Sequence, residues 1–525
     1  MAFLLHTNSN SETGNRTAGT NMTCWLDHAV EDTHHQALEE NLKTDVVIVG
    51  GGIAGLTTAY CLAVSGKKVI VLEDGQIGSG ETGRTTAHIT TALDDRYYTM
   101  EEIFGKKNTA LIAESHKMAI DYIEDIVNKE NIDCEFERLN TYLFLHPNDK
   151  KENLEKEMNA MFRCGIDARL LEITPGVPSE QACLAIPNQA QFHPMKYLLG
   201  LCKAIENKGG KIFVNTHAES ISSTGVFTDK GFSISAKHVV VATNAPVNDT
   251  YTMMLKQWAY RTYVIGALVK KNTIPKALWC DTGYHNSIKQ TPYHYVRLTS
   301  YNNEYDLLIS GGEDHIVGER SYIKEEHRYE LLEKWTRARF PIESIVHHWS
   351  GEVLVPMDTI PYIGRNRFDK KNVYIITGTA GIGMTYCTIG GMLITDLING
   401  KQNKWEKIYD PARFTLKASK PFFKMLKDDF IAILEKWFKK ESSDINTVQK
   451  GEGKVIVQKG KKCGAYRDET GKLFLVSAEC THLKCIVNWN NDEKSWDCPC
   501  HGSRFTYAGK VINGPANKDL ERVRV

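Results

Sequence analysis

The stretch DVVIVGGGIAGLTTAYCLAVSGKKVIVLE, from Asp45 to Glu73, decides the fold of most of this chain. The apolar run Val46–Val49 ends at a glycine-rich turn, a helix-compatible run continues to Ser65, and a second apolar run covers Val69–Leu72. Short apolar runs interrupted by glycines predict a strand, a tight turn, a helix and a second strand in that order.

Three glycines in the turn each have a physical reason. Gly50 allows the tight turn, Gly52 lets a pyrophosphate approach the backbone, and Gly55 lets the helix pack closely on the strand. Glu73 ends the second strand about 20 residues later, where a carboxylate can accept hydrogen bonds from an adenosine ribose. A glycine-rich turn in another α/β domain is the alternative. Because strand, helix and acidic residue are all in place, the stretch predicts a dinucleotide-binding unit.

The composition is typical of a globular enzyme. The chain has 525 residues, enough for roughly three domains. Lys plus Arg equals Asp plus Glu at 64 each, so the charge does not indicate a nucleic-acid partner. The segment MAFLLHTNSNSETGNRT has no basic region before its apolar patch, which is not typical of a signal peptide. The longest apolar stretches, near Val46 and Val373, are too short to span a bilayer, and we expect a cytoplasmic protein.

The segments on either side of the dinucleotide unit are polar. We expect residues 1–44 to be a flexible N-terminal arm. Gly78–Leu93 has the sequence GSGETGRTTAHITTAL, whose hydroxyls and backbone amides suit a phosphate or a flavin edge. An ordinary surface loop would have the same composition. Arg84, Thr85 and His88 stand out because they directly follow the phosphate-binding unit.

The middle of the chain predicts further helices and a second sheet. Apolar residues at helical spacing predict helices over 106–129, 150–162 and 193–208. Ala236–Ala242 predicts a buried strand that ends at Thr243, at the sheet edge where ligands bind. Residues 255–350 are richer in Tyr, Trp and His and predict an antiparallel sheet. Such a sheet, packed over a cofactor domain, is a natural wall for a substrate pocket.

A second glycine-rich loop follows the apolar strand Val373–Thr377. It contains Gly381, Gly383 and Met384 and leads into a helix. Small residues and the positive end of the helix dipole would therefore face the ring system of a bound ligand. The spacing is not a second G-x-G-x-x-G, and the sequence contains no other. Flavin reductases that take hydride from a nicotinamide usually carry two such units, so NAD(P)H is not indicated.

Together, GGGIAG, SGETGRTTAHI, HPMKYLLGL, VVVATNAP, DTIPYIG and GTAGIGMT resemble the D-amino-acid oxidase type of FAD-dependent oxidoreductase, which includes glycine oxidase and sarcosine oxidase. The resemblance covers roughly residues 45–400 and implies FAD between the first βαβ unit and the 378–385 loop. It also implies oxidation of a C–N bond by hydride transfer. Covalent relatives attach flavin to a His in the first loop or a Cys near the last strands. Arg84 stands where that His would be, and no Cys lies between Val353 and Gly364, so we expect non-covalent FAD.

The same resemblance gives candidates for the substrate side. Relatives often hold a substrate carboxylate with Arg and Tyr side chains of the antiparallel sheet. The matching residue types here are Tyr260, Arg261, Tyr263, Tyr293, Tyr295 and Arg297. The candidate catalytic residues are Tyr260, Arg261 and His88. No motif gives any of them a role, and each tyrosine taken singly is better explained as core or surface.

The stretch PFFKMLKDDFIAILEKWFKK, within residues 411–450, has apolar residues at helical spacing between lysines. A helix lying on a membrane surface is one interpretation. Asp428, Asp429 and Glu435 interrupt the basic face, so docking on the oxidoreductase domain is favoured. The following ESSDINT is typical of a linker.

Residues 451–525 carry a metal-binding pattern. Cys480 and His482 form C-x-H, and Cys498 and His501 form C-x-x-H. Two thiolates and two imidazoles suit a four-coordinate zinc, and they also suit a [2Fe-2S] cluster with the thiolates on one iron and the imidazoles on the other. The surrounding HLKC, HGSRF and GPA resemble a Rieske domain, which favours the cluster.

The resemblance to Rieske domains extends further. In the high-potential Rieske proteins of respiratory complexes a disulfide braces the two ligand loops, and Cys485 and Cys500 stand at its positions. Ser503 is able to donate a hydrogen bond to a cluster sulfur and raise the potential. Phe505 stands where those proteins usually have Tyr, so we expect a somewhat lower potential within the Rieske range of roughly −150 to +300 mV.

The predicted fold class is an α/β FAD-binding Rossmann-like domain with an antiparallel β-sheet substrate domain, plus a small all-β Rieske domain. The oxidoreductase covers 45–410, with the substrate part at about 255–350, and the Rieske domain covers 451–525. The N-terminal arm (1–44) precedes them, and the helix and linker (411–450) connect them.

These parts predict a dehydrogenase. An amine or amino-acid-type substrate would reduce FAD, the cluster would take the electrons singly, and an external acceptor would receive them. Two neutral imidazoles make such a cluster easier to reduce than a four-Cys ferredoxin, so electrons should flow from flavin to cluster. A Rieske oxygenase would need an iron site of two His and a carboxylate, which no segment clearly offers. The alternative from another class is a redox sensor or electron-transfer adaptor without metabolite turnover.

Overall fold

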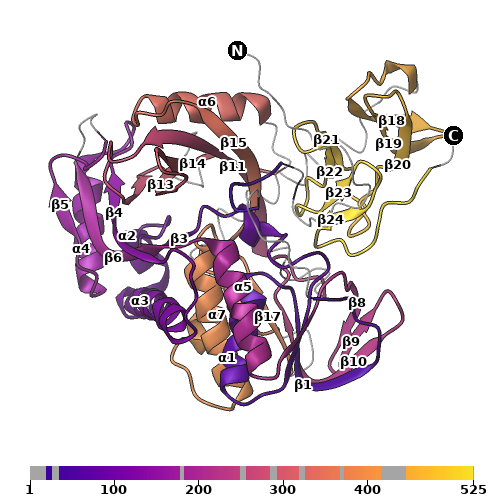
Figure 1. The fold of residues 1–525 in the computed structure, drawn as a ribbon, viewed down its shortest axis with the longest axis horizontal. Helices are drawn as coiled ribbons and strands as arrows, with labels where there is room; N and C mark the ends of the chain where they lie inside the picture. Colours follow the sequence, from indigo (N-terminus) through magenta and orange to yellow (C-terminus); the bar gives the residue numbers. More distant parts are fainter. Residues whose placement is uncertain are drawn as a thin grey trace.

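A computed structural model describes residues 19, 21–26, 35–177, 182–248, 253, 256–283, 293–317, 325–366, 372–415 and 445–523. The chain forms a parallel sheet with helices, a large mixed sheet and a small C-terminal β domain (Figure 1). The amphipathic helix predicted within 421–440 lies outside the described residues, as does most of the predicted N-terminal arm.

The first sheet contains the predicted dinucleotide unit. Its strands lie in the order β16-β17-β10-β1-β2-β7, and β1 pairs in parallel with both β10 and β2. β17 and β7 extend the parallel sheet on either side, whereas β16 is antiparallel. The bounds are β1 (Leu42–Val49), β2 (Val69–Leu72), β7 (Lys211–Phe213), β8 (Ala218–Ser222), β9 (Gly225–Thr228), β10 (Ser233–Val241), β16 (Tyr362–Arg365) and β17 (Val373–Thr377).

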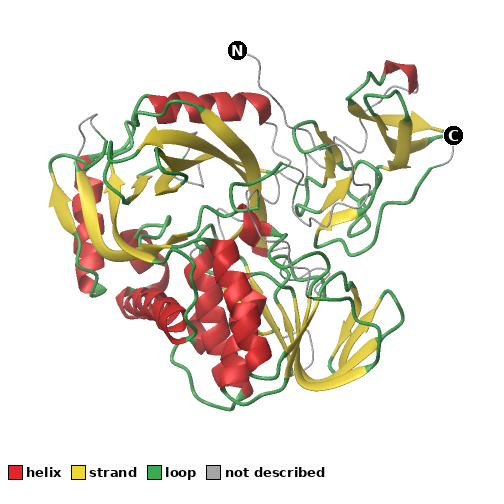
Figure 2. Cartoon of the chain, viewed as in Figure 1, coloured by secondary structure: helices red, strands yellow, loops and turns green. Residues whose placement is uncertain are grey.

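Helices pack together beside this sheet, as Figure 2 shows in red. α1 (Ile53–Val64) contacts both α5 (Pro194–Asn207) and α7 (Gly383–Ile398), and α3 (Lys106–Lys129) packs on α7. Every residue of α1 before Val64 is buried, which explains why the helix is apolar on all sides. The cofactor-binding unit is therefore held in the interior of the molecule.

The second sheet has the strand order β15-β11-β14-β13-β12-β4-β6-β3 and is antiparallel except where β12 pairs with β4. The antiparallel sheet predicted for 255–350 is only part of it, because strands from residues 88–191 complete it. The bounds are β3 (His88–Ile89), β4 (Glu137–Phe144), β5 (Arg169–Leu171), β6 (Cys183–Gln191), β11 (Gln257–Lys270), β12 (Leu278–Asp281), β13 (His294–Ser300), β14 (Tyr305–Ile316) and β15 (Ile345–Pro356).

The remaining helical segments are η1 (Glu81–Arg84), α2 (Tyr97–Phe104), α4 (Lys151–Arg163), α6 (Glu325–Arg337), α8 (Glu406–Tyr409) and η3 (Ile445–Thr447). The helices predicted over 106–129, 150–162 and 193–208 correspond to α3, α4 and α5, with small differences at the ends. Within the described part of the chain, no helix is both long and apolar enough to cross a membrane.

The C-terminal domain consists of two small antiparallel sheets, β18-β19-β20 and β21-β22-β23-β24. The second of these lies between the first and the oxidoreductase part (Figure 1). The bounds of the strands in the two sheets are β18 (Gly453–Gln458), β19 (Lys461–Arg467), β20 (Leu473–Ser477), β21 (Asn488–Asn490), β22 (Ser495–Asp497), β23 (Arg504–Thr506) and β24 (Val511–Asn513).

Candidate functional site

The glycine turn after β1 brings three segments of backbone close together. Gly50 has φ of +115°, and a Cβ there would lie 2.5 Å from the carbonyl oxygen of Ala242. A Cβ on Gly55 would lie 1.8 Å from the carbonyl oxygen of Gly50, so only glycine lets α1 start this close to the turn. Gly52 and the first residues of α1 line the cavity described next, with the positive end of the helix dipole beside it.

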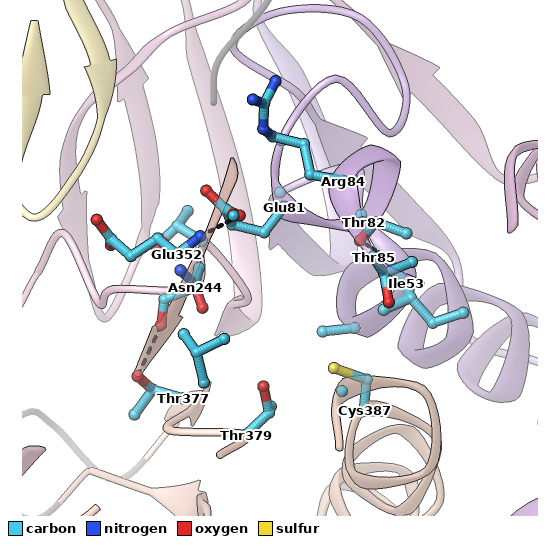
Figure 3. A pocket seen from close by; sticks show the side chains of 18 of the residues that line it. Ile53, Glu81, Thr82, Arg84, Thr85, Asn244, Glu352, Thr377, Thr379 and Cys387 are labelled. Carbon is cyan, nitrogen blue, oxygen red and sulfur yellow. Dashed lines mark hydrogen bonds between the residues drawn. The ribbon is translucent and has the colours of Figure 1, made fainter. Parts of the chain in front are cut away.

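A cavity of about 280 Å³ lies between the parallel sheet, the mixed sheet and the C-terminal domain. Its walls come from the glycine turn, the 80–94 segment, the 376–384 loop and strands of the mixed sheet. Residues 511–514, 516 and 517 of the C-terminal domain also line it. Figure 3 shows several of these walls, with Ile53 and Thr82 on one side and Thr377 and Thr379 on another.

The walls of the cavity fit a large, polar and partly planar ligand. Gly378 and Gly381 have positive φ and give the second loop a small, open surface. Thr377 Oγ1 donates to the carbonyl oxygen of Asn244 (2.6 Å). Asn244 Nδ2 is buried and has no hydrogen-bond partner among the described residues, which leaves a donor for a ligand. The cavity therefore has a glycine-rich loop on two sides and an unused hydrogen-bond donor, and both features fit FAD.

Glu73 is the acidic residue that follows β2. Its Oε2 accepts a hydrogen bond from the Gly51 N–H (2.6 Å), and its Oε1 accepts one from the Gly75 N–H (2.9 Å). Burial raises the pKa of Glu73 to about 7, although these two hydrogen bonds favour the charged form. The residue lines the cavity, where it remains the proposed partner of the ribose.

Most of the predicted cofactor residues meet at this cavity. Those that line it are Gly50, Gly52, Glu73, Arg84, Thr85, Thr243, Gly381, Gly383 and Met384. Gly55 does not line it and serves helix packing instead. The guanidinium of Arg84 points away from Thr377 and Thr379 in Figure 3, toward the C-terminal domain.

His88 lines the cavity, but both of its ring nitrogens are occupied. Nε2 donates to the Val296 carbonyl oxygen (3.1 Å), because a carbonyl oxygen can only accept, and Nδ1 therefore accepts from the Thr86 hydroxyl (3.0 Å). Burial, helped by the charge of Arg297, lowers the pKa of His88 to about 4. The ring is neutral at physiological pH and is poorly placed to act as a base.

Two of the predicted catalytic candidates, Tyr260 and Arg261, do not line the cavity. Tyr260 packs in a small apolar cluster with Val355. Arg261 is 2% exposed, and its Nη2 lies 3.2 Å from Asp497 and 3.8 Å from Glu352. The interpretation of Arg261 as a substrate-binding residue is therefore not supported, because its charge holds the C-terminal domain.

Tyr293 and Tyr295 are the aromatic candidates that reach the cavity. The hydroxyls of Tyr295 and Thr262 are hydrogen-bonded at 2.7 Å. Burial raises the pKa of both tyrosines well above the usual value, so they stay neutral. Tyr263 packs edge-on against Tyr329 and does not line the cavity.

The predicted metal ligands lie on two neighbouring loops of the C-terminal domain. Cys480 and His482 follow β20, and Cys498 and His501 follow β22. The ring centroids of the two histidines lie 5.1 Å apart. The two thiols are buried and hydrogen-bonded to each other. His501 Nδ1 is buried without a hydrogen-bond partner among the described residues, so a ring nitrogen is left for a metal.

A disulfide joins Cys485 to Cys500 and ties these two loops together. The Ser503 hydroxyl contacts the thiol of Cys480 and accepts a hydrogen bond from the Ala516 N–H (3.0 Å). Two thiols and two imidazoles fit a [2Fe-2S] cluster, and the Ser503 hydroxyl beside a sulfur could donate a hydrogen bond to it.

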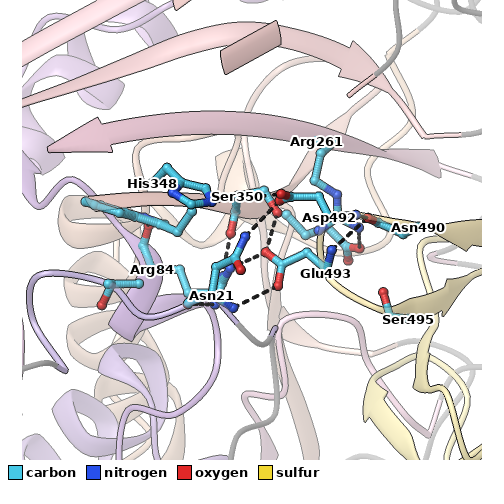
Figure 4. A network of polar contacts seen from close by, with 12 residues as sticks. Asn21, Arg84, Arg261, His348, Ser350, Asn490, Asp492, Glu493 and Ser495 are labelled. Atoms are coloured by element: carbon cyan, nitrogen blue, oxygen red, sulfur yellow. Dashed lines mark hydrogen bonds and ion pairs between the residues drawn. The ribbon is translucent and has the colours of Figure 1, made fainter. Parts of the chain in front are cut away.

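Buried charges connect the two domains, as Figure 4 shows. Arg84 Nη2 lies 2.5 Å from Glu493 Oε1, and the Ser350 hydroxyl donates to the same oxygen (2.8 Å). The Asn21 N–H donates to the other carboxylate oxygen (3.1 Å). Burial alone would raise the pKa of Glu493, but Arg84 and Arg504 outweigh burial and hold it at about 2. Glu493 is therefore fully charged inside the protein.

The loop that carries His501 lies on the same interface. A Cβ on Gly502 would lie 2.7 Å from Glu352 Oε2, so this loop touches β15. Glu352 also lines the cavity, and Asn513 Nδ2 donates to both Glu352 (3.5 Å) and Glu81 (3.3 Å). Sequence reasoning missed Glu352 and Asn513 because each is a single polar residue outside any motif.

The cavity is lined by a glycine-rich turn and lies beside a site of two Cys and two His. This combination is the one expected of a flavin-dependent oxidoreductase with an iron–sulfur domain. The family model for FAD dependent oxidoreductases (DAO) matches residues 45–397, and the Rieske [2Fe-2S] domain model matches 438–524. The chain belongs to the FAD-dependent oxidoreductase family and carries a C-terminal Rieske domain. It is an enzyme whose cofactors are FAD and a [2Fe-2S] cluster.

Individual relatives agree with this membership. The putative Rieske 2Fe-2S iron-sulfur protein YhfW of Bacillus subtilis is 35% identical over 493 residues, covering 93% of this chain and 94% of that protein. Gamma-glutamylputrescine oxidoreductase of Escherichia coli is 26% identical, covering 70% and 87%. Glycine oxidase from Geobacillus kaustophilus superposes with a TM-score of 0.59 at 17% identity, covering 71% of this chain and 100% of that chain. The predicted fold class is confirmed.

We expect Cys498→Ser to lose the cluster, because a Rieske cluster needs all four ligands. The iron content of the purified protein should fall to less than about one tenth of the wild-type value, with loss of the EPR signal of the reduced cluster. Cys463→Ser, which changes a buried cysteine of β19 outside the site, is the matched control and should keep its iron. Full iron in Cys498→Ser would exclude this residue as a ligand.

We expect Arg84→Met to lower the free energy of unfolding by about 3–5 kcal/mol, because it leaves the buried Glu493 carboxylate without its nearest cation. The double variant Arg84→Met/Glu493→Gln should recover at least half of the loss. Arg163→Met, at an exposed ion pair with Glu101, is the control and should cost less than about 1 kcal/mol in the same urea titration. Equal losses in the single and double variants would show that the pair is not coupled.

Proposed function

We propose that this enzyme is a dehydrogenase that oxidises an amine or amino-acid-type substrate and passes the electrons from FAD through the Rieske cluster to an external one-electron acceptor. In this proposal residues 45–410 form the dehydrogenase and 451–525 the electron-transfer domain. The proposal rests on one observation: residues of the Rieske domain form part of the wall of the cavity that would hold FAD. Glu352 lines the same cavity and contacts the loop that carries His501.

The type of substrate is supported by the relatives and by the cavity. Similar proteins include gamma-glutamylputrescine oxidoreductase, glycine oxidase and L-proline dehydrogenase, whose names all refer to amines or amino acids. The cavity wall from the mixed sheet offers neutral hydroxyl groups, with Thr262 and Tyr295 hydrogen-bonded to each other. Such groups orient a small polar molecule and do not ionise at neutral pH.

The proposed reaction balances as follows. The carbon next to the substrate nitrogen loses a hydride and the nitrogen loses a proton, which leaves an imine that water hydrolyses. When bound, FAD supplies the two-electron acceptor, and the cluster supplies a one-electron path to the external acceptor. The protein's own contribution is to fix the Rieske domain against the cavity through Arg84, Arg261 and their buried carboxylate partners.

We also propose that FAD is bound without a covalent link. The ring nitrogens of His88 are both hydrogen-bonded within the protein. Cys387 presents a thiol to the cavity (Figure 3), but burial raises its pKa to about 12, so it remains protonated and a poor nucleophile. Acid precipitation of the purified enzyme should release all of the flavin into the supernatant. Yellow colour retained in the pellet would indicate a covalent bond.

The test of the electron path is anaerobic photoreduction of the flavin in the intact enzyme, followed by visible and EPR spectroscopy. We expect the cluster to become reduced at a rate that does not depend on enzyme concentration, because the transfer is within one chain. In Cys498→Ser, which should lack the cluster, the flavin should stay reduced. Reduced flavin beside an oxidised cluster in the wild type would exclude the path.

Titration of the oxidised enzyme with amines and amino acids then tests turnover. Flavin bleaching followed by the EPR signal of the reduced cluster is the expected result. If photoreduction reduces the cluster while every amine and amino acid leaves the flavin oxidised, the dehydrogenase proposal fails and the sensor or adaptor function takes its place.

A further inference from the structure

The Rieske domain contributes one continuous segment to the wall of the FAD cavity. This segment, residues 511–517, begins with β24, and we call it the strap. The family model for FAD dependent oxidoreductases matches the chain only as far as residue 397, so the strap lies outside it. The strap residues that line the cavity are Val511, Ile512, Asn513, Gly514, Ala516 and Asn517.

The first part of the strap contacts two walls of the cavity. Asn513 Nδ2 donates to Glu81 Oε1 (3.3 Å) and to Glu352 Oε1 (3.5 Å). A Cβ on Gly514 would lie 3.4 Å from Val247 Cγ1, so the strap also packs on the turn that follows β10. The strap therefore connects the wall formed by η1 and β15 to the carboxyl end of the parallel sheet.

The end of the strap is held by His217, which lies between β7 and β8. His217 Nε2 lies 3.1 Å from the Asn517 carbonyl oxygen, and His217 Nδ1 lies 3.2 Å from Asp74 Oδ1. Asn517 Nδ2 also donates to the Glu219 carbonyl oxygen (3.3 Å). His217, Asp74 and Asn517 line the cavity, as does Glu73. The strap is thus fastened at the end of the cavity where the proposed partner of the ribose lies.

His217 makes both contacts only when its ring is protonated. A carbonyl oxygen and an ionised carboxylate both accept, so each ring nitrogen must donate. The hydrogen bond with Asp74 raises the pKa of His217 although burial opposes it, and Asp229 and the Asn517 carbonyl oxygen act in the same direction as Asp74. A neutral ring has one N–H, which would stay with the charged Asp74 because that hydrogen bond is the stronger one. Loss of the proton therefore frees the strap.

We propose that the strap is part of the FAD-binding site and that its contact with His217 retains FAD in the cavity. FAD then leaves when the strap separates from His217. This inference goes beyond the proposed function, because it concerns retention of the cofactor and holds for any substrate. Below the raised pKa of His217 the protonated ring holds the strap, and as the pH rises through that pKa the contact is lost and FAD leaves faster.

Cofactor exchange tests the strap without any turnover. The intact enzyme is loaded with FAD and mixed with a large excess of 5-deaza-FAD, and the FAD that remains on the desalted protein is measured over time. The measurement is made at about pH 6 and at about pH 8.5, on either side of the range in which a histidine with a raised pKa titrates. We expect the wild-type enzyme to release FAD about 5-fold faster at the higher pH.

Two variants of His217 separate this contact from other titrating groups. The amide of His217→Gln can donate to the Asn517 carbonyl oxygen at any pH, so its release rate should change less than about 2-fold between the two pH values. His217→Ala has no donor and should release FAD about 10-fold faster than the wild type at about pH 6, with little further change at higher pH. Burial raises the pKa of Glu73 to about 7 and that of Glu352 to about 8, but both residues remain in every variant, so their effect appears in His217→Gln as well.

His327→Gln is the matched control, because it replaces an exposed histidine of α6 that pairs with Glu330 and does not line the cavity. It should release FAD at the wild-type rate at both pH values. The proposal is overturned if His217→Ala retains FAD as long as the wild type at about pH 6, or if His217→Gln keeps the full pH dependence of the wild type. If His217→Ala does not fold, the comparison of His217→Gln with the wild type decides alone. Photoreduction tests the electron path separately, so the two failures are distinguishable.

Discussion

Buried charges at the boundary between the oxidoreductase part and the Rieske domain are the constraint on which the rest of the molecule depends. A carboxylate removed from water is stable only beside a cation or several donors, and Glu493 obtains both from Arg84, Ser350 and Asn21. Because these contacts are directional, they favour the observed orientation of the Rieske domain, in which the buried charges are paired.

This docking decides the form of both functional regions. It brings Gly502, beside the predicted ligand His501, against Glu352, and it places residues 511–514, 516 and 517 in the wall of the cavity. It also places Arg261 between Glu352 and Asp497, so that the arginine of β11 faces the Rieske domain. The closure of the cavity and the position of the cluster loop therefore have a common cause.

Local sequence patterns located helices and strands that have a regular apolar spacing. They also identified candidate ligands that lie close together in the sequence. The second predicted strand, Val69–Leu72, is β2, and helix α3 covers the predicted 106–129. Most predicted FAD residues line the cavity, whereas Tyr260 and Arg261 do not. Residue type and strand assignment alone do not tell which face of β11 meets the cavity and which meets another domain.

The sequence by itself determined the two cofactor units, because a glycine turn and a C-x-H with C-x-x-H pattern are short-range constraints in which each residue type has its own steric or chemical reason. The mixed sheet is different, since β4 pairs with β12, which lies more than a hundred residues further along the chain. Only the tertiary structure decided the partner of each buried charge and which residues of the mixed sheet line the cavity. Those partners come from segments far apart in the chain, and they are chosen by packing and desolvation, which no local pattern records.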